Sequence, residues 1–440
     1  MTLLILYAVL LLGVGVWDRH TSHRFEEYVL AGRRHGTVFV TSGLLATALG
    51  ASATMGVIQL AWQIGFPAFW WLGVGAIGLI IQAIFLSKKL FQCKVFTLPE
   101  LTCRLLGKEA QFALAIMIAV GWLGIISAQF VAAAKIVEVA GGISWNVSLL
   151  GVVVVICAYV WLGGNAAIVK TDVVQFGILT GTIILCLFYL LTQHPIPPVA
   201  LKPIFLNSQF PFSKWIYFLI IVGAGYVICP ILYSRVFAAK STQVAKRSLF
   251  HAAGWLILLG VCIVGIGLWA QYYIPYQQGV DVFSLILNQW LPPWMSILLI
   301  VGILSAVVSS ADTCLIVIAT IIEQDIFHKK RVSGVQKALF LTGLSAYLLA
   351  GWKQEILPLL LIAYAIFSAG AVPPISVFLF GNKTAAPEDK KIIIFAFAIG
   401  GGLGLVGSIF ESDMIVLSGF FISLILSLWA FFRKKANPAS

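Results

Sequence analysis

The sequence predicts an all-α integral membrane protein of thirteen transmembrane helices, and three observations lead to this fold class. Hydrophobic residues make up 61% of the 440 residues, charged residues make up 10%, and the mean hydropathy is +1.02. The apolar residues form continuous runs long enough to span a bilayer, which takes about 20 residues. Alternating strand patterns are absent, and helices satisfy their own backbone inside a membrane. The expected spans are 2–17, 37–64, 67–87, 110–139, 146–163, 173–192, 215–238, 250–272, 292–322, 335–352, 355–381, 391–410 and 414–432.

The basic residues indicate the orientation of these spans. A net charge of +12 in a soluble protein would suggest a nucleic-acid partner. With the N-terminus outside, every Lys and Arg falls on the inner side except Lys202, Lys214 and Lys353, which face outward, and Lys135, which lies inside a span. An excess of Lys and Arg in cytoplasmic loops is the usual topology signal. The charge therefore predicts a multi-pass protein of the plasma (bacterial inner) membrane, N-terminus outside and C-terminus inside, with no nucleic-acid partner.

The second expected span is interrupted near its middle by the small and polar run Gly50-Ala51-Ser52-Ala53-Thr54-Met55-Gly56. Glycine weakens a helix, and an unwound segment frees carbonyl groups that are tolerated in a membrane only where they line a cavity. The alternative is a close helix–helix contact. Because Gly50 and Gly56 are six residues apart, the four-residue spacing of the common dimer motif does not apply.

Two features follow before the middle of the chain. The inward loop 88–109 carries Thr97-Leu98-Pro99-Glu100, which is typical of a helix start with Thr97 as the N-cap. We therefore expect a short surface helix there. In the fourth span Lys135 and Glu138 are three residues apart near the outer end. They pair with each other or reach the interface, or Lys135 contacts a substrate carboxylate.

The fifth to seventh spans contain two further interruptions. Gly163-Gly164 is expected to break the fifth helix, and Thr171-Asp172 to cap the next one, with Asp172 either a plain cap or also an ion ligand. The seventh span contains Gly223-Ala224-Gly225-Tyr226 followed by Cys229-Pro230, which predicts a second broken helix. In the eleventh span, Ser368 to Gly370 and Pro373-Pro374 indicate another flexible helix.

The ninth span concentrates oxygen-bearing side chains within an apolar helix. Ser305, Ser309, Ser310, Asp312 and Thr313 lie within nine positions. Ser309, Ser310 and Thr313 share one helical face, and Asp312 borders it. Small Ser and Thr residues also allow close helix packing, which is the plain alternative. A carboxylate with several hydroxyls at one level instead favours a small hard cation such as sodium.

The two broken spans are five apart, which predicts two five-helix units related by an inverted repeat, with a site at mid-membrane between the breaks. The expected divisions are a first helix and cytoplasmic loop, a first repeat, an extracellular connection, a second repeat, and two C-terminal helices with a cytoplasmic tail. They cover 1–36, 37–192, 193–214, 215–382 and 383–440.

Six segments resemble signatures of the sodium:solute symporter family, in the family's order: VLAGRRHG, GASATMG, TLPELTCRLLG, WLGGNAAIVKTDVVQ, ILYSRVFAAKS and SSADTCLIVIATIIEQDIF. The segment AQFVAAAKIVEVAGGIS is most similar to the proline and pantothenate branch, where a basic residue occupies the Lys135 position. Members of the proline branch carry an acidic residue where this chain has Ala53, which speaks against proline. The resemblance implies a LeuT-type fold and sodium-coupled uptake of a small organic solute.

The resemblance also implies sites. The family's sodium site would use the carbonyls of Ala51, Thr54 and Ala306 and the hydroxyls of Ser309 and Ser310. A second sodium or proton site would use Asp172, Ser309, Asp312 and Thr313. The residues expected to bind substrate are Ser52, Ala53, Gly56, Lys135, Gly225 and Tyr226.

These observations predict a secondary active symporter that imports a carboxylate or amino-acid-like solute by alternating access. The expected partners are that solute, co-transported sodium and the lipid bilayer, without an organic cofactor, a transition metal or an obligate protein partner. No P-loop or nucleophile triad is present, which argues against an ATPase or another enzyme. Proton coupling through Asp172 or Asp312 is the alternative, followed by a membrane sensor built on a transporter fold.

Overall fold

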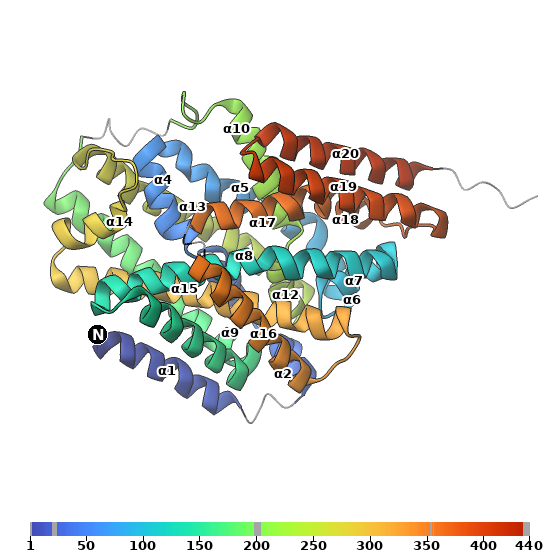
Figure 1. The fold of residues 1–440 in the computed structure, drawn as a ribbon, viewed down its shortest axis with the longest axis horizontal. Coiled ribbons are helices and arrows are strands. Elements are labelled where there is room, and N and C mark those ends of the chain that lie inside the picture. The colour runs from blue at the N-terminus through green and yellow to red at the C-terminus, as the bar shows by residue number, and fades with distance from the viewer. Residues whose placement is uncertain (1, 20–23, 198–203, 353, 355, 434–440) are drawn as a thin grey trace, which may run out of the picture.

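The computed structural model describes residues 2–19, 24–197, 204–352, 354 and 356–433, and the side chains of 356–359 are not described. Lys202 and Lys353, which contribute to the charge asymmetry, lie outside these residues. Every regular element in the described chain is helical. The helices run roughly along the long axis of the molecule, and α1 begins at the opposite end from the one where α20 ends (Figure 1). The two ends are called the α14 end and the α7 end after the short helices found there.

The helices of the first half include the first broken span and the two longest helices. They are α1 (Thr2–Asp18), α2 (Phe25–Leu30), η1 (Ala31–Arg33), α3 (Thr37–Ala48), η2 (Ser52–Gly56), α4 (Val57–Ile64), η3 (Phe66–Phe69), α5 (Trp70–Ile81), η4 (Gln82–Leu86), α6 (Ser87–Cys93), α7 (Leu98–Leu106), α8 (Lys108–Gly141) and α9 (Trp145–Gln193).

The second half contains the central helix α15. Its elements are α10 (Phe212–Tyr217), η6 (Phe218–Gly223), α11 (Ala224–Val227), α12 (Pro230–Phe237), α13 (Thr242–Tyr273), α14 (Val282–Leu285), η7 (Ile286–Trp290), α15 (Pro293–Ile321), η8 (Ile322–Ile326), α16 (Val332–Trp352), α17 (Ile356–Gly370), α18 (Val372–Gly381), η9 (Pro387–Asp389), α19 (Lys390–Ile409) and α20 (Asp413–Phe432).

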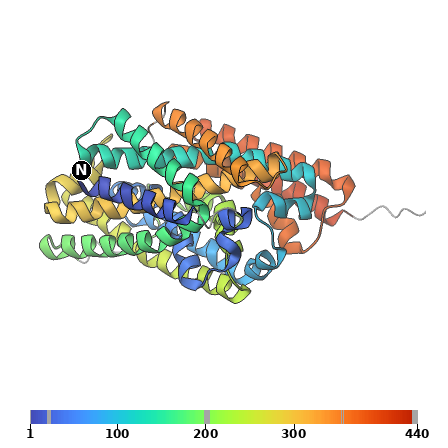
Figure 2. The same ribbon diagram turned by 90° about the horizontal axis from the view of Figure 1, so that it is seen from below.

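Helix α15 forms the centre of the bundle. Every residue from Gly302 to Ile321 is buried, polar ones included. Helices α8, α9 and α16 pack against it, and α3 contacts it from the first broken span. Helix α1 and the C-terminal pair α19 and α20 lie along opposite edges of the bundle (Figure 1), and in the view from below α1 crosses in front of the other helices (Figure 2). The oxygen-rich segment of the ninth expected span is therefore held in the interior, away from the lipid-facing surface.

Fewer helices meet the length and apolarity of a membrane span than the thirteen that the sequence predicts. Within the described residues, nine helices are long and apolar enough to cross a membrane, or eleven if each bent pair is one span. Helix α1 has only 17 residues. Helix α9 covers both the fifth and sixth expected spans in 49 residues. Thirteen crossings therefore stay a prediction.

The break in α9 is a single residue, and this corrects the expected cap at Thr171-Asp172. Gly164 has φ 56° and ψ −154°, a conformation that essentially requires glycine. A Cβ there would lie 2.8 Å from the Tyr28 carbonyl oxygen. Helical structure resumes directly after Gly164, so Asp172 lies inside α9 and not at a helix start. Its carboxylate is therefore available for tertiary contacts.

The first broken span bends by 63° between α3 and the segment that starts at Ser52. Only Leu49 to Ala51 leave the helical ladder, a shorter interruption than the expected run from Gly50 to Gly56, because η2 is wound as a π-turn. Gly50 allows close approach here, since a Cβ would lie 2.7 Å from Ser310 Oγ and 2.8 Å from the Gln129 amide. The break is thus surrounded by polar groups from α8 and α15.

The second broken span separates α11 from α12 at two extended residues, Ile228 and Cys229. Gln82 Nε2 donates to the carbonyl oxygens of Tyr226 at 2.7 Å and Val227 at 3.2 Å. Tyr233 Oη also donates to the Val227 carbonyl at 2.9 Å. These side chains supply the donors that the interrupted helix no longer provides. A third bend of 45° separates α17 from α18, close to the expected Ser368–Gly370 and Pro373-Pro374.

The short helix α7 begins with a side-chain cap. Thr97 caps α7 as predicted, because its Oγ1 accepts from the Glu100 amide at 3.1 Å and Glu100 Oε2 accepts from the Phe96 amide at 2.7 Å.

The segments that flank the two broken spans also pair at the α7 end. The His35 amide donates to the Ala238 carbonyl at 3.2 Å, and the Lys240 amide donates to the His35 carbonyl at 3.0 Å. The two broken helices are joined at this end by backbone hydrogen bonds.

Candidate functional site

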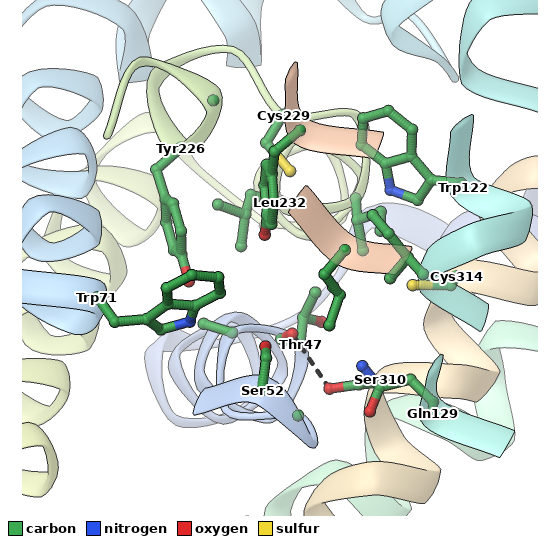
Figure 3. A pocket seen from close by; sticks show the side chains of 17 residues that line it. Thr47, Ser52, Trp71, Trp122, Gln129, Tyr226, Cys229, Leu232, Ser310 and Cys314 are labelled. Carbon is green, nitrogen blue, oxygen red and sulfur yellow. Dashed lines mark hydrogen bonds between the residues drawn. The ribbon is translucent and has the colours of Figure 1, made fainter. Parts of the chain in front are cut away.

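A small cavity lies between the two breaks, with a volume of about 40 Å³. This volume is large enough for water but smaller than an organic solute, so the helices must move for a solute to bind. Among the described residues, none of those that line the cavity is Asp, Glu, Lys or Arg. The lining residues include Thr47, Gly50, Ser52, Trp71, Trp122, Gln129, Gly225, Tyr226, Cys229, Leu232, Ser310, Cys314 and Tyr364 (Figure 3).

Ser310 connects the central helix to the break in the first broken span. Its Oγ donates to the Ala46 carbonyl at 2.9 Å and reaches the Thr47 carbonyl at 3.2 Å (Figure 3). Both carbonyls belong to the last turn of α3, where a helix has no further amides to offer them. On the other side of the break, Gln129 Oε1 accepts from the Ala51 amide at 2.9 Å. The break thus presents a hydroxyl and carbonyl oxygens at one level.

The structure assembles the expected sodium ligands only in part. Ser310 contacts the carbonyls of residues 46 and 47, four or more positions before the expected carbonyl of Ala51. The Ala51 carbonyl accepts from the Gly56 amide at 3.0 Å, inside the π-turn. Thr54 is fully buried, and its Oγ1 donates to the Gly50 carbonyl at 2.9 Å. Ala306 is buried one helical turn before Ser310 on α15.

The expected second site contains a guanidinium group from α12. Arg235 is only 1% exposed, and its Nη2 lies 2.8 Å from Asp172 Oδ2. Nη1 donates to Asn165 Oδ1 at 2.9 Å, and Nη2 also donates to Thr313 Oγ1. Ser309 donates to the other Asp172 oxygen, so Ser309 lies between the two expected sites. An internal cation therefore already pairs with Asp172.

Asp312 adds a second carboxylate to this cluster. It is fully buried, and Thr313 Oγ1 donates to its Oδ1 at 3.2 Å. In the part of the chain that the structure describes, Asp312 Oδ2 has no hydrogen-bond partner. Two carboxylates with one guanidinium leave a formal charge of −1 if both acids are ionised. Such a charge is costly inside a membrane protein unless another cation balances it.

The expected substrate residues are divided between the cavity and other places. Ser52, Gly225 and Tyr226 line the cavity, whereas Ala53 and Gly56 are buried beside it. Lys135 lies in a separate small pocket near the α14 end, together with Asp281 and Ser284. Within the described residues no ion pair joins Lys135 to Glu138. The structure thus gives Lys135 no direct route to a solute held between the breaks.

Several lining residues were not predicted from the sequence. Trp71 lies on α5, Trp122 and Gln129 on α8, and Tyr364 on α17. Each is an aromatic or amide residue inside an ordinary apolar span, and no local break or charge marks it. The buried position of Arg235 is not apparent from the sequence for a different reason. Because it follows a span closely, it is expected among the basic residues of an inward loop.

A bundle of apolar helices with two interrupted helices around a central cavity, and with a hydroxyl and carbonyl oxygens gathered at one interruption, is the architecture of a membrane transporter. The comparison with known sequences identifies the group. The profile of the "Sodium:solute symporter family" matches residues 28–194 and 200–385. The chain belongs to the sodium:solute symporter family.

Curated relatives cover nearly all of the chain at low identity. The sodium/pantothenate symporter of Escherichia coli strain K12 is 24% identical over 97% of this chain and 94% of its own length. The sodium/proline symporter of Haemophilus influenzae is 24% identical over 86% of this chain and 82% of its own. The high-affinity choline transporter 1 of Torpedo marmorata is 25% identical over 91% and 76%.

Solved structures show the same fold. A sodium-coupled sialic acid symporter in a substrate-bound outward-open state has a TM-score of 0.77 at 17% identity, over 98% of both chains. The nucleobase-cation-symport-1 transporter MHP1, closed around bromovinylhydantoin, has a TM-score of 0.64 at 14% identity, over 92% of this chain and 93% of its own. The chain therefore has the LeuT-type fold that the sequence resemblance implies.

Proposed function

We propose that the protein is a sodium-coupled symporter that imports a small organic solute, carboxylate or amino-acid-like, by alternating access between the two broken helices. The proposal includes thirteen spans, a 5+5 inverted repeat, and a membrane orientation with the N-terminus outside and the C-terminus inside. The names of the relatives support it, since they describe sodium-dependent carriers of pantothenate and proline.

The contact of Ser310 with the Ala46 and Thr47 carbonyls carries this proposal. A hydroxyl that donates to two helix-end carbonyls occupies the place that a small cation would take between the same oxygens. Sodium bound there would tie α3 to α15. The ion would favour one arrangement of the broken helix only through its higher affinity for that arrangement. Ala51, Thr54, Ala306 and Ser309 are the further proposed ligands.

The available driving force is sufficient for uptake. Moving one charge through 100 mV provides ~2.3 kcal/mol, and a tenfold sodium gradient adds ~1.4 kcal/mol. Their sum of ~3.7 kcal/mol concentrates a neutral solute several-hundred-fold for each sodium ion.

A proton or a second sodium ion at Asp172, Asp312 and Thr313 is the second candidate. The unpartnered Asp312 Oδ2 favours it, whereas the Arg235–Asp172 ion pair supplies one cation already. Solute uptake into sodium-free vesicles across a pH series distinguishes proton coupling from sodium coupling, because only proton coupling predicts accumulation driven by a pH gradient.

Thermal unfolding of the purified protein in NaCl and in matched KCl tests the sodium site. We expect specific stabilisation by sodium, and Ser310→Ala should raise the half-maximal sodium concentration about tenfold, equivalent to ~1.4 kcal/mol. Ser418→Ala is the control, because Ser418 is exposed and its hydroxyl donates to the Met414 carbonyl in the preceding turn. An unchanged half-maximal concentration in Ser310→Ala contradicts the proposed site.

A further inference from the structure

A carboxylate solute needs a group that binds its negative charge, and the expected partner Lys135 lies outside the central cavity. The cavity instead contains the start of α12. The second broken span resumes at Pro230, and Cys229, Ile231 and Leu232 all line the cavity. The N-terminus of a helix carries unpaired amides and a partial positive charge. Broken helices of membrane transporters direct such ends at anionic groups.

The α12 N-terminus has little internal competition for its amides. Cys229 is the N-cap, and its thiol faces the amides of Ile231 and Leu232 without forming a cap hydrogen bond in the described structure. Sulfur is a weak acceptor, unlike the Ser, Thr, Asp or Asn residues that usually occupy this position. Pro230 has no amide hydrogen to satisfy. The donors of the first turn therefore face only a weak internal acceptor, which a carboxylate can displace.

A second donor points to the same ligand. Trp122 is 2% exposed and lines the cavity, and its indole Nε1 has no hydrogen-bond partner among the described residues. Its ring packs edge-on against Phe367 at a centroid distance of 4.7 Å, which fixes the orientation of the indole. In Figure 3, Trp122 and Cys229 lie on the side of the cavity opposite Ser52 and Ser310. A buried N–H without an acceptor is unfavourable until an acceptor arrives.

We propose that the first-turn amides of α12 and the Trp122 indole N–H together form the binding site for the carboxylate of the transported solute. This inference rests on the proposed symport function and names its substrate class and recognition residues. All donors in this site are uncharged, so the carboxylate keeps its charge without forming a buried ion pair. The rings of Trp71, Tyr226 and Tyr364 then contact the apolar body of the solute, with Ser310 and the sodium site on the opposite side.

Matched pairs of small molecules test the charge requirement. Pantothenate and panthenol differ only in a carboxylate against a hydroxymethyl group, and proline and prolinamide in a carboxylate against an amide. Binding is measured by the shift of thermal unfolding in saturating NaCl. We expect the carboxylate that binds to do so at least tenfold more tightly than its uncharged partner. Equal binding of both partners, or binding of neither carboxylate, overturns the proposal.

Two substitutions at one position provide the sharpest test. Serine is a good N-cap, so Cys229→Ser should cover the α12 amides and weaken binding of the carboxylate about tenfold. Cys229→Ala removes the thiol and leaves the amides free, so binding should be equal to or tighter than wild type. If both variants bind alike, the α12 N-terminus does not hold the carboxylate.

The indole is tested with a matched tryptophan. Trp122→Phe keeps a ring against Phe367 but removes the N–H, and should weaken carboxylate binding several-fold. Trp215→Phe removes an indole N–H that is likewise unpartnered in the described structure but lies outside the cavity, so binding should not change. Equal affinities in both variants overturn the role of Trp122.

The sodium response separates this proposal from the proposed function. If sodium stabilises all variants normally but no carboxylate preference appears, the recognition site is wrong and symport stands. If the carboxylate binds selectively but identically in NaCl and KCl, the recognition site stands and sodium coupling fails. Because the sodium response also reports a folded site, it shows that a variant with lost carboxylate binding has not simply unfolded.

Discussion

The two broken helices satisfy their interrupted backbones in different ways. At the first break, the Ser310 hydroxyl covers the Ala46 and Thr47 carbonyls, and Gln129 accepts from the Ala51 amide. At the second, Gln82 and Tyr233 donate to the Tyr226 and Val227 carbonyls, whereas the α12 amides face a thiol. The first break therefore presents carbonyl and hydroxyl oxygens, and the second presents N–H groups. On the two proposals made above, the first interrupted helix would bind the cation and the second would bind the carboxylate.

The largest expected effect comes from the buried ion pair between Arg235 and Asp172, which holds α12, the helix that follows the second break, against α9. Arg235→Met would leave Asp172 buried without its cation, and we expect a loss of about 3–5 kcal/mol of unfolding free energy. The double change Arg235→Met with Asp172→Leu should recover most of this loss, as both charges are then removed. Chemical denaturation in detergent measures both.

The control for the Arg235–Asp172 ion pair is Arg34→Met. Arg34 pairs with Glu27, but its side chain is 68% exposed, against 2% for Arg235. An exposed pair contributes about 0–1 kcal/mol. Equal losses for Arg34→Met and Arg235→Met would show that the buried pair does not anchor α12.

At the first break, Gly50→Ala should act on the sodium response as well as on stability. The new Cβ would displace Ser310 Oγ and the Gln129 amide, at 2.7 and 2.8 Å. Overpacking of this kind costs about 1–3 kcal/mol. We expect sodium to stabilise the variant less than it stabilises the wild type. Gly177→Ala, a helical position with open space around its Cβ, should leave the sodium response unchanged, and a matching loss there would refute the argument from close approach.

Substitution of Gln129 at the first break and of Gln82 at the second allows a direct comparison of the two breaks. Gln129→Leu and Gln82→Leu each leave buried backbone groups without a partner, at about 1 kcal/mol or somewhat more. Because Gln129 binds the first break and Gln82 the second, only Gln129→Leu should weaken the sodium-dependent shift of thermal unfolding. A sodium defect in Gln82→Leu alone would reverse the assignment of the breaks to the two ligands.

The variant with the smallest expected effect at neutral pH is at His35, near the α7 end. Burial, helped by the nearby cations Arg235, Arg34 and Lys170, lowers the pKa of His35 from 6.5 to about 4. Since the folded protein resists protonation of His35, its stability is full above about pH 6.5 and declines as the pH falls from 6.5 towards 4. His35→Gln should flatten this part of the stability profile. The exposed His251→Gln serves as control, and a profile that His35→Gln leaves unchanged would contradict the prediction.

Local signals in the sequence were sufficient for much of the fold. The apolar runs predicted a helical membrane bundle, and Thr97 was found as a cap because capping depends on neighbours within four residues. The polar face of the ninth span marked the buried centre of α15. Glycine and proline runs indicated both broken helices, although the first interruption is shorter than expected because Ser52 to Gly56 wind into a π-turn.

The site was harder to predict because it depends on contacts between distant segments. The sequence predicts Asp172 as a helix cap, either alone or also as an ion ligand, yet its partner is Arg235, and no sequence periodicity connects residues on α9 and α12. Arg235 itself counted as a loop charge, since a basic residue just beyond a span normally reaches water. Trp122 is one of 14 tryptophans, and only the cavity distinguishes its indole from those that simply fill space.

The pairing of His35 with Ala238 and Lys240 couples the two broken helices through main-chain atoms alone. Such a link does not depend on side-chain identity, so it can persist among distant relatives while their sequences diverge around it. The link also constrains motion, because the segments that flank the two breaks are bonded to each other. If the α7 end opens, these two segments must either move together or break both amide hydrogen bonds. Amide hydrogen exchange at His35 and Lys240 would then report how often this end of the molecule opens.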